Sequence, residues 1–316
     1  MPEVVSRDRF LGCLLGQAVG DALGAPFEGY PADFIYWQYG SIREQLIRLP
    51  DGPLRYTDDT QMMIGVAEDL LNHDEILPAT LMERFAARYD PERGYGAGAR
   101  RLLEAAAAGE DWDRLAETLF PGGSFGNGAA MRVAPVGMVF AHDLVRATGQ
   151  AVVSARVTHR HPLGIEGARL FAIAVALASR GPPLDRRAFY RELARDCREE
   201  EFAWQLRAAR RLRAGHSLAF LGNSLPAHRS VVTAIACFTC SPDSFEGCIE
   251  RAIAQGDDTD TLAAMAGALC GAYLGVDAIP AAWIDNLERG PDGLDYLRTL
   301  ADGLWQLHDR LVTRTG

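Results

Sequence analysis

The sequence predicts an all-α protein. Apolar residues recur with helical spacing along almost the whole chain, and runs of alternating Val, Ile, Tyr and Thr between hairpin turns are lacking. Hydrophobic residues make up 48% of the 316 positions and charged residues 23%, which is the composition of an ordinary globular protein. A chain of this kind can bury a substantial helical core.

The periodicity predicts helices over residues 8–24, 59–72, 79–89, 97–108, 129–141, 147–158, 164–180, 186–213, 229–240, 244–254, 260–275 and 294–312. The helix over 186–213 is rich in Arg and Glu and is predicted to be a solvated surface helix. Loops are predicted over residues 25–56, 90–96, 109–128 and 276–292. Helical scaffolds usually carry their functional side chains on such loops.

Two of the predicted helices carry glycine at every fourth position. The stripes are Gly12, Gly16, Gly20 and Gly24 in one helix and Gly267, Gly271 and Gly275 in the other. Glycine inside a helix costs about 1 kcal/mol relative to alanine, so a stripe needs a compensating contact. Because positions four apart share one helix face, we expect both helices to lie at the centre of the fold with closely approaching backbones.

The composition excludes several classes of function. All 32 basic residues are arginine, so a P-loop lysine, a kinase lysine, a pyridoxal-phosphate Schiff base and a lysine general base are impossible. The 42 acidic residues give a formal charge of −10, which argues against a general nucleic-acid surface.

Targeting features and cysteines indicate the cytoplasm. No apolar run reaches the roughly 18 residues needed to cross a bilayer, and the N-terminus MPEVVSRDRF lacks the apolar region of a signal peptide. Six cysteines, mostly in apolar stretches, are expected to be buried reduced thiols. The Cys237 and Cys240 pair has no second pair and lies in an apolar helix, so no zinc or redox role is assigned to it.

Carboxylates and hydroxyls gather at the predicted starts of two apolar helices, in residues 56–60 (YTDDT) and 256–261 (GDDTDT). One Asp or Thr would suffice as a helix cap, whereas these segments contain five aspartates and four threonines. Buried carboxylates without a counter-charge are strongly unfavourable. Oxygen ligands of this kind suit a hard divalent cation such as Mg²⁺, Mn²⁺ or Ca²⁺ rather than zinc, so we predict a metal site, with capping alone as the alternative.

If both segments hold one site, residues about 200 positions apart must meet. The length alone suggests about two domains. A shared site instead predicts a single domain over residues 1–316.

Two further polar segments are candidates for ligand binding. Residues 121–132 (PGGSFGNGAAMR) form a glycine-rich loop running into a helix, and its free N–H groups and the Ser124 hydroxyl could hold a phosphate, although such loops are often simple turns. His159 and His161 could bind metal or substrate, although a histidine at a helix end is more often satisfied by backbone.

Six segments carry a resemblance to a known family. They are FLGCLLGQAVGDALGAPFEG (10–29), YTDDTQM (56–62), DPERGYGAG (90–98), GSFGNGAAMRVAPVG (123–137), THRHP (158–162) and GDDTDTLAAMAGALCGAYLG (256–275). Together and in this order they resemble the ADP-ribosylhydrolase (ADP-ribosylglycohydrolase) family, which includes the ADP-ribosylserine hydrolases and the dinitrogenase-reductase-activating glycohydrolase. The segments RGYGAG and GSFGNGAAMR are more similar to the branch acting on serine-linked and poly-ADP-ribose than to the arginine branch.

The resemblance implies a compact orthogonal helical bundle with a central site for two Mg²⁺ ions, or Mn²⁺ in their place, at the bottom of an ADP-ribose cleft. By motif position, the metal ligands would be Thr57, Asp58, Asp59, Asp258, Asp260 and Thr261. The ADP-ribose contacts would be Gly94, Phe120, Gly123, Ser124, Phe125, Gly126, Asn127 and His159, with the two phenylalanines on either side of the adenine.

The implied catalytic residues are Glu28 and Asp258. Glu28 falls where the serine-directed branch has a mobile glutamate near the scissile bond. Two positions depart from the family pattern. Asp257 stands where a small or neutral residue is usual, so a third ligand and an outward-facing cap are both open, and Phe125 replaces a frequent tyrosine.

The resemblance implies hydrolysis of the glycosidic bond at C1″ of ADP-ribose in ADP-ribosylated proteins or peptides, with release of ADP-ribose. Serine-linked, polymeric and O-acetyl substrates are favoured over arginine-linked ones. The transition state would be oxocarbenium-like, and either a metal-activated water or Glu28 as base would fit. A non-catalytic ADP-ribose-binding module and a Mg²⁺-dependent nucleotide pyrophosphohydrolase are the alternatives, and the product, if any, distinguishes the three.

Overall fold

Every regular element is a helix in the described chain, which comprises residues 4–48 and 52–315 of a computed structural model. The α-helices are α1 (Arg7–Gly24), α2 (Ala32–Tyr39), α3 (Ile42–Ile47), α4 (Asp58–His73), α5 (Pro78–Arg88), α6 (Ala97–Ala107), α7 (Trp112–Thr118), α8 (Ala134–Val139), α9 (Leu144–Arg156), α10 (Pro162–Ala178), α11 (Arg186–Asp196), α12 (Glu200–Ala209), α13 (Ala227–Cys240), α14 (Phe245–Ile253), α15 (Thr259–Leu274), α16 (Ala281–Asp285) and α17 (Leu294–Thr315). The 3-10 helices are η1 (Ala25–Phe27), η2 (Pro91–Arg93), η3 (Asn127–Ala129), η4 (Ala219–Leu221) and η5 (Val276–Ala278). The all-α prediction is confirmed.

Two predictions fall partly outside the described residues. Residues 1–3 belong to the N-terminal stretch in which no signal peptide is predicted, and residues 49–51 belong to the predicted loop over 25–56.

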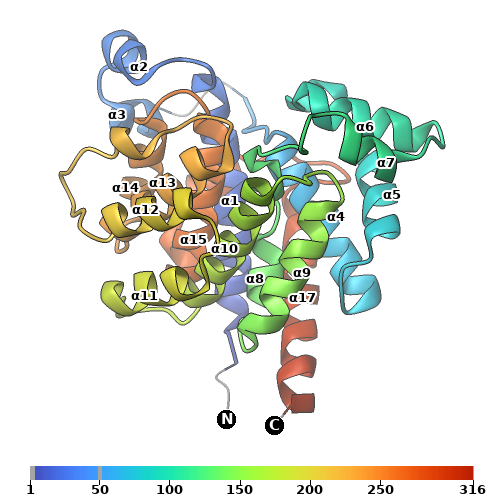
Figure 1. Ribbon diagram of the computed structural model, residues 1–316. Coiled ribbons are helices and arrows are strands. Elements are labelled where there is room, and N and C mark those ends of the chain that lie inside the picture. Colours follow the sequence, from blue (N-terminus) through green and yellow to red (C-terminus); the bar gives the residue numbers. More distant parts are fainter. Residues whose placement is uncertain (1–3, 49–51, 316) are drawn as a thin grey trace.

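Helices α1 and α15 form the central pair of the fold (Figure 1). A Cβ atom added at Gly12 would lie 2.3 Å from the carbonyl oxygen of Gly271, and one at Gly20 would lie 2.1 Å from that of Ala263. Both distances are far below any real contact, so only glycine permits this backbone approach. The predicted close packing of the glycine stripes is confirmed.

The other helices pack around this pair over one continuous hydrophobic core. Figure 1 shows α10 and α13 on one side of it and α4, α8 and α17 on the other. Both ends of the described chain lie at the bottom of that view, whereas α2, α6 and α7 lie at the top, near the starts of α4 and α15.

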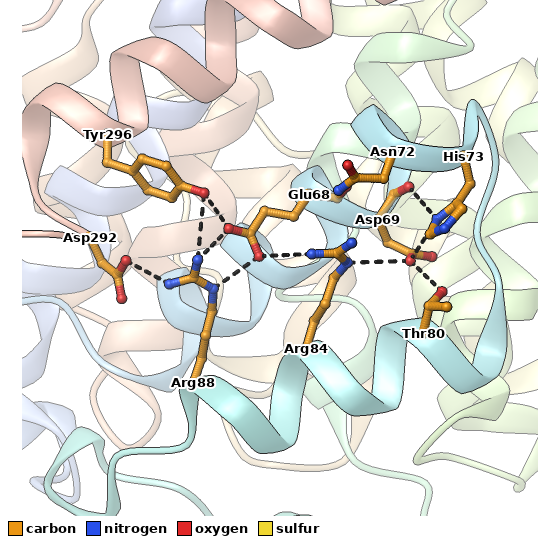
Figure 2. Close-up of polar contacts among 9 residues, drawn as sticks. All are labelled: Glu68, Asp69, Asn72, His73, Thr80, Arg84, Arg88, Asp292 and Tyr296. Carbon is orange, nitrogen blue, oxygen red and sulfur yellow. Dashed lines mark hydrogen bonds and ion pairs between the residues drawn. The ribbon is translucent and has the colours of Figure 1, made fainter.

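The second half of α4 is anchored by side chains from α5 and α17 (Figure 2). The Glu68 carboxylate accepts hydrogen bonds from Arg88 and from the Tyr296 hydroxyl. The neighbouring Asp69 carboxylate accepts a 2.6 Å hydrogen bond from Thr80 and lies 3.5 Å from Arg84. These contacts hold α4 in place from the end opposite its acidic start.

The helix boundaries differ from the prediction in several places. Helices α2, α3, α7 and α16 lie within predicted loops. The single helix predicted over 186–213 is two helices, α11 and α12, because the chain turns where the backbone N–H of Arg198 donates to the buried Glu166 carboxylate, at 2.7 Å. The helix predicted from residue 129 begins at Ala134, because Pro135 disfavours helical backbone before it.

The expectation that no apolar stretch is long enough to cross a membrane needs one correction. The stretch Arg7–Phe27 passes that test by length and composition. In the structure 89% of its most apolar window is buried against other helices, as in the core helix of a soluble protein. A single such stretch near the N-terminus is weak evidence for a membrane span.

Candidate active site

The two acidic segments meet at the starts of α4 and α15. One Asp59 carboxylate oxygen accepts hydrogen bonds from the hydroxyls of Thr57 and Thr261, each at 3.2 Å. Asp59 and Thr261 are separated by 202 positions in the sequence. The tertiary fold therefore brings together the residues that the sequence analysis assigns to one site.

Few of these Asp and Thr side chains cap a helix. Thr57 caps α4 through its hydroxyl, which accepts from the backbone N–H of Asp59 at 3.4 Å. Asp258 precedes the first residue of α15, yet its side chain makes no capping hydrogen bond. It accepts instead a 2.5 Å hydrogen bond from the Asn127 amide. Capping alone does not account for the carboxylates.

The carboxylates of this group lack an ion-pair partner in the part of the chain that the structure describes. None of the ion pairs in the described chain includes Asp21, Glu28, Asp58, Asp59, Asp258 or Asp260. One carboxylate oxygen of Asp59 and one of Asp260 are buried without a hydrogen-bond partner. Burial and repulsion from neighbouring carboxylates raise the pKa of Asp59 well above its ordinary range and that of Asp260 to about 8. A bound cation would satisfy both unpartnered oxygens and reduce the repulsion between the carboxylates.

Two buried residues of α1 organise the start of α4, and the sequence analysis did not identify them. The Asp21 carboxylate accepts from the backbone N–H of Thr57 at 2.9 Å, and from the N–H and hydroxyl of Thr60 at 3.0 and 2.6 Å. The Gln17 amide donates to the carbonyl oxygens of Asp59 and Met131. A buried Asp within the otherwise apolar helix LGQAVGDALG was the available signal.

Glu28 reaches the acidic group from the other side. Its carboxylate, that of Asp258 and that of Asp260 offer oxygens within 4.8 Å of one another. Burial, and then the charge of Asp260, raises the pKa of Glu28 to about 7, although its side chain is the exposed member of the three. Glu28 therefore lies beside two of the predicted metal ligands, Asp258 and Asp260.

The loop that carries Glu28 is hydrogen-bonded to Asp257, the residue for which a ligand role and a cap role were both open. The N–H of Gly29 donates to the Asp257 carbonyl at 2.7 Å, and the N–H of Asp257 donates to the Tyr30 carbonyl at 2.8 Å. Asp257 has a positive φ of 55° and an exposed side chain. Its backbone fastens the Glu28 loop, and its side chain is exposed to solvent.

A cavity of about 400 Å³ opens above these carboxylates. Its lining includes the following predicted site residues: Glu28, Asp58, Gly94, Phe120, Ser124, Gly126, Asn127, His159, Asp258, Asp260 and Thr261. Thr57 and Asp59 are not in the lining and belong to the layer that supports it. A larger hollow of about 630 Å³ beside α16 contains none of these residues.

The glycine-rich loop contributes less open backbone than expected. The N–H groups of Gly123, Gly126 and Asn127 already donate hydrogen bonds within the protein, to the Phe120 carbonyl, the Ser124 hydroxyl and the Leu225 carbonyl, respectively. A Cβ atom at Gly123 would lie 2.5 Å from the backbone nitrogen of His161, so this glycine permits close packing. Gly123 is not part of the cavity lining.

The aromatic pair predicted around the adenine is not assembled in this structure. Phe120 lines the cavity, whereas the Phe125 ring lies outside the lining and contacts the His161 ring edge-on, with centroids 5.6 Å apart. Both rings are exposed. The reason is the packing of residues 123–125 against the 160–161 turn, which draws Phe125 towards His161.

His159 is held as a neutral ring at the cavity wall. Its Nδ1 lies 2.7 Å from the Thr158 hydroxyl, with which it shares a hydrogen bond. Burial, with a smaller contribution from Arg132, lowers the pKa of His159 to about 3. Arg132 is the only arginine in the cavity lining; it donates to the Ser154 carbonyl at 2.7 Å and lies over the Phe85 ring. The sequence analysis had assigned it no role.

Comparison with known proteins identifies the family. The sequence profile described as ADP-ribosylglycohydrolase matches residues 2–314. The chain is 33% identical to the ADP-ribosylhydrolase ARH3 of Danio rerio over 95% of this chain and 91% of that protein, and 33% identical to the one of Homo sapiens over 90% of each. It is also 30% identical to the ADP-ribosyl-[dinitrogen reductase] glycohydrolase of Rhodospirillum rubrum, over 89% of this chain and 91% of that protein.

A solved structure shares the fold. It is described as an ADP-ribosylglycohydrolase-related protein complex, with a TM-score of 0.76, 28% sequence identity, and coverage of 96% of this chain and 98% of that one. With the helical fold and the converged carboxylates, these similarities show that the chain belongs to the ADP-ribosylglycohydrolase family and is a glycosyl hydrolase that acts on ADP-ribosyl groups.

Proposed function

We propose that this hydrolase cleaves the bond at C1″ of ADP-ribose attached to protein side chains and releases ADP-ribose. Serine-linked, polymeric and O-acetyl-ADP-ribose are the favoured substrates over arginine-linked ones. The observation that carries the proposal is the convergence of Glu28, Asp258 and Asp260 within 4.8 Å in the cavity lining, with no ion pair to any of them among the described residues. Carboxylates placed in this way stabilise the positive charge that develops on the sugar during glycoside hydrolysis.

The donor set fits two hard divalent cations, for which we propose Mg²⁺, with Mn²⁺ as the alternative. The side chains offer oxygen ligands only, and the orphaned oxygens of Asp59 and Asp260 are the atoms that a cation would satisfy. The residues that would hold the metals are Thr57, Asp58, Asp59, Asp258, Asp260 and Thr261. When bound, such ions act as Lewis acids and orient the sugar hydroxyls.

Glu28 and Asp258 are the proposed catalytic residues. Glu28 is exposed at the rim of the acidic group, so its carboxyl can donate a proton to the leaving oxygen or accept one from the attacking water. The Asp258 carboxylate is held by the Asn127 amide, which donates at 2.5 Å, and it would stabilise the positive charge that develops on the sugar.

The rest of ADP-ribose is assigned to the cavity walls. The Ser124 hydroxyl and the Gly126 and Asn127 region would receive the diphosphate, supported by the neutral His159 ring. Phe120 would cover one face of the adenine, and Gly94 gives the opposite rim room for the distal ribose. Gly123 and Phe125 lie outside the cavity lining, so they would contact ADP-ribose only if the glycine-rich loop moved on binding.

A single assay tests the proposal. Purified protein is incubated with serine-linked, arginine-linked, polymeric and O-acetyl substrates, with and without EDTA, and the products are identified by mass spectrometry. We expect free ADP-ribose, fastest from serine-linked substrate, and none in EDTA. AMP with ribose phosphate would show a pyrophosphohydrolase instead, and binding without any product would show a non-catalytic ADP-ribose-binding module.

Two further proposals concern the whole chain. We infer that residues 1–316 work as one domain, because the site is built from α1, α4, α15 and the segments between them. We also infer a cytoplasmic location, supported by six cysteines that are free thiols in the structure, five of them buried.

A further inference from the structure

A row of exposed aromatic side chains follows Glu28 in the chain. Tyr30, Phe34 and Trp37 are 40%, 36% and 77% exposed and lie on one face of α2 and the residue pair before it. The rings of Tyr30 and Phe34 stack with centroids 4.8 Å apart, and those of Phe34 and Trp37 are 6.2 Å apart. We call these three residues the aromatic ridge. Contiguous exposed apolar surface of this kind is uncommon unless it meets a partner.

The ridge begins at the mouth of the active site and is fixed there. Tyr30 is two residues from Glu28, and its carbonyl accepts the N–H of Asp257, the residue before Asp258. A Cβ atom at Gly256 would lie 2.3 Å from the Ala32 nitrogen, so the start of α2 packs directly on the acidic segment. On its other face α2 buries Ile35 in the core. Figure 1 shows α2 at the outer edge of the bundle, with free space around it.

The chain segment that carries the ridge is acidic. Between residues 28 and 42 the charged residues are Glu28 and Asp33, and the exposed Arg43 follows in α3. The exposed Asp257 side chain lies beside the same loop. Aromatic faces flanked by carboxylates attract arginine and lysine side chains through cation–π and ionic contacts. They repel polyanions, and they also repel a second copy of a chain whose net charge is −10.

We propose that the aromatic ridge binds the polypeptide that flanks the ADP-ribosylated side chain, and that it favours segments carrying arginine or lysine. This inference rests on the proposed function, which places the scissile bond beside Glu28. The polypeptide must leave the cavity at that point, and the ridge is the surface that it meets. The ridge thus determines which modified proteins are processed, whereas the cavity recognises ADP-ribose.

The test compares substrates that share ADP-ribose and differ in the polypeptide. The double variant Phe34→Ser/Trp37→Ser is assayed with an ADP-ribosylserine peptide flanked by arginine and lysine, with the same peptide flanked by glutamate, and with O-acetyl-ADP-ribose. We expect KM for the basic peptide to rise roughly 10-fold, the size expected for losing two cation–π contacts, while kcat and the O-acetyl-ADP-ribose kinetics stay the same.

A matched control removes exposed aromatic surface elsewhere. Trp204 and Phe220 are 53% and 48% exposed, contact each other and make no ring contact with the ridge, so Trp204→Ser/Phe220→Ser should leave all three substrates unaffected. A second variant, Asp33→Arg, changes one exposed charge and leaves the rings in place. It should reduce or reverse the preference for the basic over the acidic peptide.

Several results would overturn the inference. Equal losses on peptide and O-acetyl-ADP-ribose would mean that the ridge only supports the Glu28 loop. An unchanged KM for the basic peptide would mean that nothing docks there, and a loss confined to polymeric ADP-ribose would assign the ridge to nucleotide stacking.

A binding experiment tests the role of the ridge independently of the proposed activity. If the wild type turns over no substrate, binding of the unmodified basic peptide is compared between wild type and Phe34→Ser/Trp37→Ser by NMR titration. Weaker binding by the variant upholds the ridge without the activity, and equal binding rejects it.

Discussion

Helix α4 carries a pair of acidic residues at each end, and the two pairs have opposite surroundings. Glu68 and Asp69, in the second half, are neutralised by Arg84 and Arg88 and by hydrogen bonds from neighbouring hydroxyls (Figure 2). Asp58 and Asp59, at the start, form no ion pair among the described residues, and Asp59 instead accepts hydrogen bonds from the hydroxyls of Thr57 and Thr261. All four side chains are carboxylates on one helix, and the two pairs differ in the groups that surround them.

The difference teaches how to distinguish a structural acid from a functional one. A buried carboxylate is tolerated when the chain supplies its counter-charge, and its role is then to join elements. Where the chain supplies none, the fold retains a charge that only a ligand can balance. In a protein without lysine, the placement of arginine alone decides which case applies.

The largest expected difference is in activity, and Asp260 of α15, which lies beside Asp58 and Asp59 in the acidic group, tests it. We expect Asp260→Asn to lower kcat/KM for ADP-ribosylserine peptide by at least about 100-fold, the lower end for losing an electrostatic group of an active site. Glu68→Gln, at the structural end, should keep kcat within a few-fold at a temperature where both variants are folded. Comparable activity in the two variants would contradict the comparison.

The free energy of unfolding should be lowered by a substitution at the structural pair and not by one at the acidic start of α4. Glu68→Gln leaves Arg88 without its main partner, so we expect a loss of about 2–4 kcal/mol in the free energy of unfolding, as for a broken, largely buried ion pair. Urea titration in EDTA measures it. Glu110→Gln is the matched control, because its ion pair with Arg101 is exposed and should contribute no more than about 1 kcal/mol. In the same buffer, Asp59→Asn should leave the protein as stable as the wild type or more so, since it removes repulsion.

Added Mg²⁺ should stabilise the acidic start of α4 and not its far end. At a concentration 100 times its Kd, a ligand specific for the folded state adds about 2.7 kcal/mol. Wild type and Glu68→Gln should therefore show the same rise in thermal midpoint on going from EDTA to saturating Mg²⁺. Asp260→Asn should show little or none. A rise of equal size in all three proteins would locate the ion elsewhere.

The smallest expected effect is a pH dependence at the structural end. Burial opposes the charged form of Glu68, but hydrogen bonds from Arg88 and Tyr296 outweigh it and lower the pKa below the ordinary value of 4.5. The stabilisation is therefore present above about pH 4.5 and is lost as the pH falls through the lower folded-state pKa. The difference in unfolding free energy between wild type and Glu68→Gln should be constant from pH 6 to 8 and shrink below about pH 4. If the difference in unfolding free energy grew as the pH fell, the pKa of Glu68 would be raised in the folded state, contrary to this prediction.

Much of the framework was predictable because its causes are local in the sequence. Helical periodicity predicted the long buried helices, and the glycine stripes predicted that α1 and α15 lie in backbone contact, as Gly12 and Gly271 show. The short helices α2 and α7 were missed, because one has its aromatic residues exposed and the other spans under two turns. The break between α11 and α12 depends on Glu166, a partner 32 residues away in the chain.

The candidate site was predictable in its composition and less so in its arrangement. Surplus Asp and Thr at two helix starts indicated a cation. Asp21, an acid within an apolar stretch of α1, was not identified, and its hydrogen bonds to Thr57 and Thr60 depend on the tertiary fold. The glycine-rich loop was expected to offer free N–H groups, yet three of them are satisfied internally by neighbours that only the folded chain brings near. Phe125 was expected at the adenine and lies against His161.

The sequence by itself determined the helical class, the family and the kinds of ligand atom, because these follow from residue types and short spacings. Only the tertiary structure decided that Asp59 meets Thr261 across 202 positions, that Glu28 joins Asp258 and Asp260, and that Glu68 receives arginines which Asp58 does not. The physical reason is that charge balance is a property of three-dimensional neighbours. The same acid is structural beside an arginine and available to a ligand where none lies within reach.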